Sequence, residues 1–72
     1  MSELIVLARR LDEMAARVRE AGARPARRLA SIDWQCPRGD RARADAEHLR
    51  RSAAAAAGSL GEAAGLLIRA VR

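Results

Sequence analysis

Hydrophobic residues recur at alternating steps of three and four along most of this chain. In the first half they are Leu4, Leu7, Leu11, Met14 and Val18, a spacing that places them on one face of a helix. The alternation resumes after position 37 and continues without a slip through Ala42, Ala46, Leu49, Ala53, Ala56, Leu60, Ala63, Leu67 and Ala70. The pattern predicts two long helices, about 3–30 and about 37–71, with a turn at about 31–36.

A connection this short folds two helices back on each other. We therefore expect an all-α chain, one domain over 1–72, that forms an antiparallel two-helix hairpin. Pro25 falls inside the first helix and should kink or interrupt it, because proline removes a backbone hydrogen bond and clashes with the turn before it. Ser2 is the expected N-cap of that helix. Two acid–Arg pairs with a spacing of four are expected on its outer face: Glu13–Arg17 and Glu20–Arg24.

The second helix has little charge and many small residues. Residues 53–68 contain a single charged side chain, Glu62, and positions that would face solvent on an isolated hairpin are Ala and Gly. Compositional bias alone can also produce Ala-rich stretches, but it does not explain the large apolar residues at 66–68. We expect the hairpin to dimerise into a four-helix bundle. The expected association seam consists of Leu4, Leu7, Leu11, Met14, Val18, Leu49, Ala53, Ala56, Leu60, Ala63, Leu67 and Ile68.

Composition also favours a partner chain. Half of the 72 residues are hydrophobic, but 18 of them are Ala and one is aromatic. A core this small usually needs disulfides, a metal or oligomerisation. One Cys and one His exclude an internal disulfide and a metal site built from this chain alone. We therefore expect a homodimer, or a heterodimer with another helical hairpin or a larger effector.

The charge balance admits two kinds of partner. All 14 basic residues are Arg, and with nine acids the net charge is +5, which suits nucleic acid or an acidic protein. Nucleic acid is the less favoured, because the Arg residues alternate with acids and no helix-turn-helix or stacking aromatics occur. His48 has no nucleophile or carboxylate pair beside it. No enzyme activity, cofactor or metal is expected, nor a signal peptide or a membrane-spanning stretch.

The turn carries the candidate recognition residues Trp34, Cys36 and Gly39. Cys36 stands at the expected N-cap of the second helix, where Ser or Gly would cap better, and Pro37 suits the first helical position. The Trp34 ring either plugs the end of the hairpin or is exposed for recognition, and both roles remain open. We favour a free thiol for Cys36 over an intermolecular disulfide.

These residues resemble the WXG-hundred family, the small helical hairpins of type VII secretion systems. Actinobacterial members often read Asp-Trp-x-(Gly or Ser)-x-Ala-Ala at the turn, and this chain has Asp33 and Trp34 followed by an Ala/Leu heptad. Cys36 stands where the family has Gly or Ser, and Ala42 where it often has an aromatic residue. The chain is shorter than its hundred residues and has no Tyr, so the family's Tyr-x-x-x-(Asp/Glu) export signal is absent.

The resemblance implies a non-enzymatic interaction protein. It would be a type VII secretion substrate, or the targeting partner of a larger secreted effector, cytoplasmic before export and secreted without a cleaved signal peptide. Because the turn Trp of one family partner and the export signal of the other act together, a Tyr-bearing partner is implied. The alternatives are a small Arg-rich nucleic-acid-binding dimer and an antitoxin-like helical partner.

Overall fold

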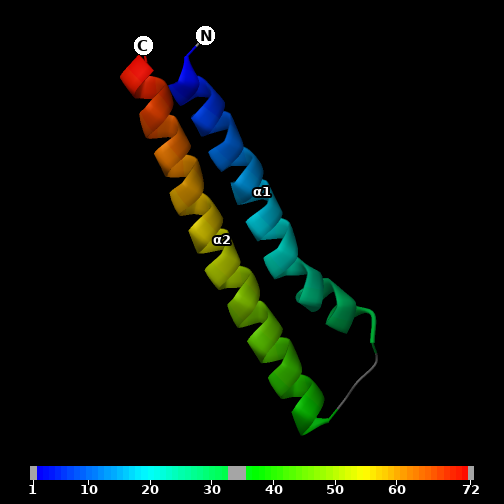
Figure 1. Cartoon of the computed structure of the whole chain (residues 1–72). Coiled ribbons are helices and arrows are strands. Elements are labelled where there is room, and N and C mark those ends of the chain that lie inside the picture. The colour runs from blue at the N-terminus through cyan, green and yellow to red at the C-terminus, as the bar shows by residue number, and fades with distance from the viewer. Residues whose placement is uncertain (1, 33–35, 72) are drawn as a thin grey trace.

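The computed structural model describes residues 2–32 and 36–71. Helix α1 spans Glu3–Ala30 and helix α2 spans Pro37–Val71. The two run antiparallel side by side, with both chain ends together and the turn at the opposite end (Figure 1). The described residues form a rod with Cα extents of 55 × 15 × 11 Å. The all-helical hairpin that the heptad pattern predicts is confirmed.

The helix ends follow local chemistry. Ser2 occupies the N-cap of α1 with extended backbone (φ −78°, ψ 127°), and its carbonyl accepts the Val6 N–H at 3.3 Å. Its hydroxyl makes no capping hydrogen bond. At the other end of α1, the Ser31 N–H and hydroxyl both donate to the Arg28 carbonyl, at 3.3 and 2.8 Å. The first and last turns of α1 are thus held mainly by backbone groups.

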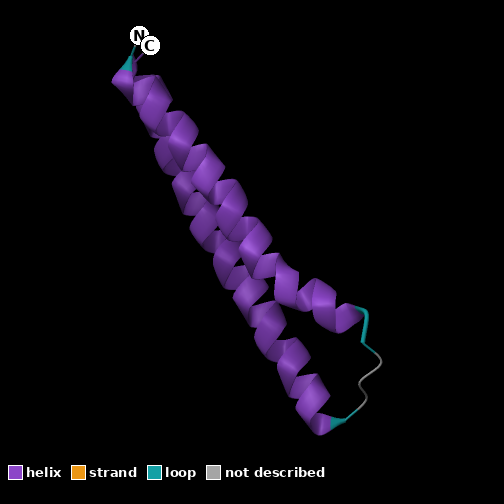
Figure 2. Ribbon diagram, turned by 45° about the vertical axis from the view of Figure 1, so that its right-hand side comes forward, coloured by secondary structure: helices purple, strands orange, loops and turns teal. Residues whose placement is uncertain are grey.

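Pro25 lies within α1 and does not end it, since the helix continues to Ala30. Of the two outcomes expected from the sequence, an interruption is excluded. The C-terminal turns of α1 diverge from α2 in both ribbon views (Figures 1 and 2). Proline has no N–H to donate to the preceding turn, which makes this the weakest point of the α1 hydrogen-bond ladder. The hairpin is therefore closed along most of its length and open near the turn.

The helices meet along small residues. The buried positions of α1 are Ala8, Ala15 and Gly22, each seven residues from the next, and the buried alanines of α2 are Ala46, Ala57 and Ala64. We call these six residues the contact line. A Cβ added to Gly22 would overlap the Cβ of Ala53 and lie 3.4 Å from the Leu49 carbonyl oxygen. Close approach of the two backbones therefore requires glycine at position 22.

The contact line does not coincide with the heptad stripe of large residues. At about 100° per residue, the Ala8, Ala15 and Gly22 positions lie roughly 60° around α1 from the centre of the stripe formed by Leu4 through Val18. No large side chain among the described residues is fully buried. The two backbones meet along Ala and Gly beside the large residues of the stripe, because Ala and Gly allow closer packing of two backbones than Leu does.

Candidate protein-interaction surface

The heptad stripes of the two helices lie on the same side of the hairpin. Each stripe is rotated from the contact line, by roughly 60–70° at 3.6 residues per turn. Because the helices are antiparallel, these rotations have opposite senses when viewed from one end, so they bring both stripes to one side. We call this surface the apolar face. It comprises Leu4, Leu7, Leu11, Met14, Val18, Leu49, Ala53, Ala56, Leu60, Ala63 and Leu67.

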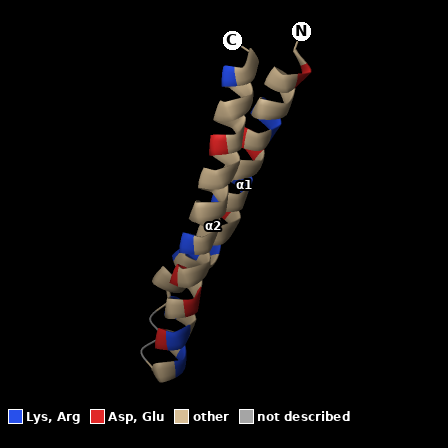
Figure 3. Ribbon diagram, turned by 90° about the vertical axis from the view of Figure 1, so that its left-hand side faces the viewer, with Lys and Arg blue, Asp and Glu red and all other residues tan. Residues whose placement is uncertain are grey.

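The apolar face leaves large side chains in solvent. Leu7, Met14 and Leu49 are 46%, 49% and 47% exposed. Leu11, Val18, Leu60 and Leu67 are half-buried. None of the eleven residues is charged, and the charged residues of α2 gather toward the turn, leaving its C-terminal half nearly free of them (Figure 3). Large exposed apolar patches of this kind mark interaction surfaces.

Ile68 does not share this face, although the sequence prediction included it in the association seam. One residue turns an α-helix by about 100°, so Ile68 lies on the opposite flank of α2 from Leu67. It is 37% exposed there. A run of adjacent apolar residues on a helix covers more than one face, so Ile68 extends the apolar surface of α2 beyond the face on which Leu67 lies.

A second surface on α2 is built from glycines. A shallow groove there is lined by Gly58, Gly61, Glu62, Gly65, Leu66 and Arg69. A Cβ added at Gly58, Gly61 or Gly65 would meet nothing within 4 Å. Contact between the helices of the hairpin therefore does not require these three glycines, in contrast to Gly22. Leu66 at the groove is 61% exposed.

Of the three candidate recognition residues at the turn, the structure describes Cys36 and Gly39. Trp34 lies outside the described residues. Cys36 is half-buried, carries a free thiol and precedes the first residue of α2. Its Sγ accepts the Gly39 N–H at 3.3 Å, and its carbonyl accepts the Asp40 N–H at 2.9 Å. The predicted capping position is confirmed, with a thiol in the place of the usual hydroxyl.

Three ion pairs occur among the described residues: Glu20–Arg27, Asp40–Arg43 and Glu47–Arg50. The expected pairs Glu13–Arg17 and Glu20–Arg24 are not formed, and Glu20 contacts Arg27 two turns along instead. Arg50 Nε donates to both carboxylate oxygens of Glu47, at 3.1 and 3.0 Å. This hydrogen bonding holds the pKa of Glu47 below its ordinary value of 4.5. All three pairs are exposed, so they contribute little to stability.

The remaining features concern catalysis, metal binding and membranes. His48 is exposed, and within residues 2–32 and 36–71 no group of three or more His, Cys, Asp or Glu side chains is placed to hold a metal. One 18-residue window of α2 has a mean hydropathy of 1.3, enough to cross a membrane by length and composition alone. This corrects the expectation that no such stretch exists. Much of that hydropathy comes from Ala, so the finding is weak evidence for a span.

Comparison of the chain with protein-family models, with curated proteins and with solved structures finds no match. The interpretation of the chain therefore rests on its own residues and their arrangement.

Proposed function

We propose that the chain is a non-enzymatic interaction protein whose apolar face docks a helical partner to complete a four-helix bundle. The observation that carries the proposal is the placement of large side chains: the contact line uses Ala and Gly, while Leu7, Met14 and Leu49 stay nearly half exposed. A hairpin with this arrangement gains its main hydrophobic stabilisation only when a second molecule covers the face.

The exposed area supports this proposal. The chain exposes 5647 Å², whereas a folded monomer of 7.8 kDa is expected to expose about 4,400 Å². The excess of roughly 1,200 Å² exceeds the ~800 Å² that each partner buries in a standard protein interface. The excess belongs to the whole elongated rod, and it is large enough to include an interface of ordinary size.

We further propose that this docking serves type VII secretion, with the chain as a substrate or as the targeting partner of a larger secreted effector. Its support is the resemblance stated above: two helices in a hairpin, with Asp33 and Trp34 between them. Because the chain has no Tyr, the proposal requires a partner that supplies the Tyr-bearing export signal.

An export assay tests the proposal. The chain is expressed with a Tyr-bearing hairpin in an actinobacterium that has a type VII system, and the culture supernatant is probed for it. Export should require the partner, the secretion ATPase and Trp34, so Trp34→Ala should abolish it. The variant L7Q/M14Q/L49Q should also block export, while the matched control I5Q/V6Q/I68Q, at exposed apolar residues off the apolar face, should not. Secretion of the chain alone, with all sibling hairpin genes deleted, would contradict the proposal.

A further inference from the structure

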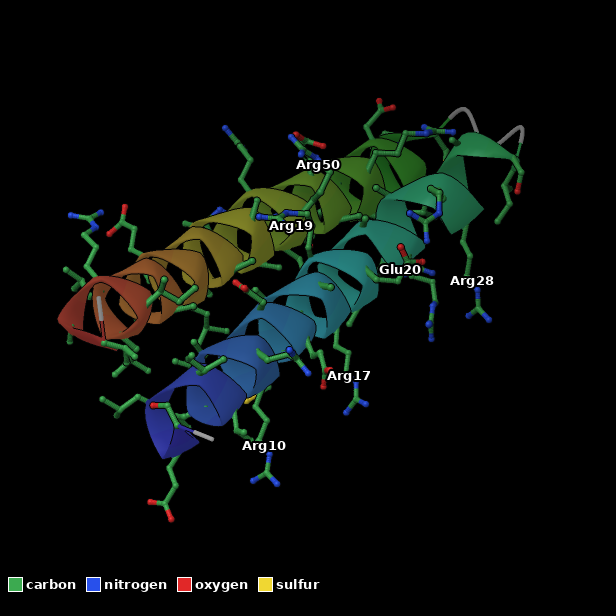
Figure 4. All side chains as sticks on the ribbon, turned by 90° about the horizontal axis from the view of Figure 1, so that it is seen from above. Arg10, Arg17, Arg19, Glu20, Arg28 and Arg50 are labelled. Carbon is green, nitrogen blue, oxygen red and sulfur yellow. The ribbon has the colours of Figure 1, made fainter. Side chains whose placement is uncertain are left out.

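Three arginines follow one edge of the apolar face at heptad spacing. These are Arg10, Arg17 and Arg24, which directly precede residues 11, 18 and 25 of the α1 heptad. They lie one above the next on the helix surface, since seven residues make nearly two turns. Arg10 and Arg17 project from the side of α1 turned away from α2 (Figure 4). All three are exposed. We call them the Arg edge.

The Arg edge forms no ion pair in the described part of the hairpin, although Glu13 and Glu20 lie one turn from Arg17 and Arg24. The ion pairs there use Arg27, Arg43 and Arg50. In helical bundles, the side chains that flank the apolar stripe choose the partner and its orientation. Three like charges at this spacing are therefore a recognition pattern for a partner with the opposite charge at the same spacing.

A second copy of this chain does not provide that pattern. Its apolar face is bounded on α1 by Glu3 and another Arg edge. On α2 it is bounded by Arg38, Asp45, Ser52, Ser59 and Leu66, which also repeat every seventh residue. Docking one such α1 edge to the other would bring three arginines and one acid, Glu3, from each copy, so like charges outnumber opposite ones, which is unfavourable. Docking it to the α2 edge would bring at most one acid, Asp45, to the arginines. The chain is complementary to an acidic partner rather than to itself.

We propose that the occupant of the apolar face is an unlike amphipathic helix or hairpin with Asp or Glu at heptad spacing beside its apolar stripe. This inference rests on the proposed function, because it names the chemistry of the partner that the apolar face docks. The leucines supply the hydrophobic contact, and the Arg edge selects the acidic partner and fixes its register.

The test uses synthetic amphipathic helices of about four heptads. They share Leu and Ala in the apolar stripe and differ only at the flanking heptad positions, which are Glu in one and Gln in the other. Isothermal titration calorimetry with the full chain should show about tenfold tighter binding of the Glu helix at low salt, as expected of three exposed ion pairs. The preference should shrink as salt is added.

Two triple variants with the same change in net charge sharpen the test. R10Q/R17Q/R24Q should bind both helices equally, whereas R9Q/R19Q/R69Q, at arginines off the Arg edge, should keep the preference for Glu. Equal binding of both helices by the unaltered chain would overturn the inference. So would equal loss of preference in the two variants, a stable homodimer that excludes the Glu helix, or tight duplex DNA binding through the Arg edge in place of helix binding.

The same measurements separate this inference from the proposed function. If the Gln helix binds as well as the Glu helix and L7Q/M14Q/L49Q weakens both, docking on the apolar face is upheld and the acidic partner is excluded. If neither helix binds, both proposals fail.

Discussion

The contact line and the apolar face divide the hydrophobic residues of this hairpin by size. Between the helices lie Ala8, Ala15 and Gly22 against the alanines of α2, while beside them Leu7, Met14 and Leu49 remain nearly half exposed. An independent hairpin would bury its large side chains first, because the gain in free energy grows with the apolar area removed from water. The reversed order is the arrangement expected if the large residues form an intermolecular core, as proposed above.

The largest expected effect comes from placing a large side chain in the contact line. Gly22→Leu should destabilise the hairpin by about 3 kcal/mol, the upper end of the usual cost of overpacking, because even a Cβ at this position overlaps Ala53. Loss of the helical circular dichroism signal, followed in a urea titration, measures it. The control is Gly61→Ala. If Gly22→Leu unfolds at the same urea concentration as the unaltered chain, the helices do not meet along the contact line.

The second prediction concerns glycines outside that line. Gly58→Ala, Gly61→Ala and Gly65→Ala should each stabilise α2 by about 1 kcal/mol, because Ala is the better helix former and the added Cβ meets open space in the hairpin. Thermal unfolding by circular dichroism measures the gain. One of these variants could gain stability in isolation yet lose affinity for a helical partner. That result would show that the partner backbone packs against the glycine groove. The apolar face would then not be the sole docking surface.

The heptad pattern was enough to predict both helices and their antiparallel arrangement, because a period near 3.5 over many turns has few other solutions. It could not predict which residues touch within the hairpin. A stripe centred on Leu and Met indicates an apolar side of each helix, but Ala8, Ala15 and Gly22 beside it permit closer backbones. The pattern does not distinguish a stripe that faces the other helix of the hairpin from one that faces a helix of another molecule.

Other features of the candidate site were missed for different reasons. The Arg edge was readable from the spacing of Arg10, Arg17 and Arg24, but its meaning depends on knowing that position 8 and not position 4 faces α2. The Glu20–Arg27 pair spans seven residues and depends on side-chain rotamers, which sequence spacing does not determine. By contrast, Cys36 was placed correctly at the N-cap, because Pro37 marks the first residue of the helix.

A smaller effect is expected at this cap. Cys36→Ser should stabilise α2 by about 0.5–1 kcal/mol, because a hydroxyl accepts the Gly39 N–H more strongly than a thiol does. The thermal midpoint in reducing buffer measures this, with Cys36→Ala as the control that removes the acceptor. The change lies far from the apolar face, so helix binding should be unaltered. A fall in stability on Cys36→Ser would show that the thiol has a role beyond capping.

The smallest expected effect is a pH dependence of stability that comes from the Glu47–Arg50 pair. Arg50 hydrogen-bonds Glu47 and lowers the pKa of that carboxyl below 4.5. A carboxyl whose pKa is depressed by folding contributes stability above its unfolded pKa and loses it as the pH falls through the folded value. The contribution is therefore present at neutral pH and is lost progressively as the pH falls below 4.5 and through the lower pKa of the folded state. Both groups are exposed, so the slope of stability against pH should change only slightly in Glu47→Gln.

Glu13→Gln removes the same charge from an exposed residue outside the described ion pairs, and it should leave that part of the slope in place. If the two variants change the slope equally, net charge and not the Glu47–Arg50 hydrogen bonds sets the acid response. Because the apolar face contains no titratable group, its hydrophobic contact with a neutral helix should show no matching dependence over this pH range.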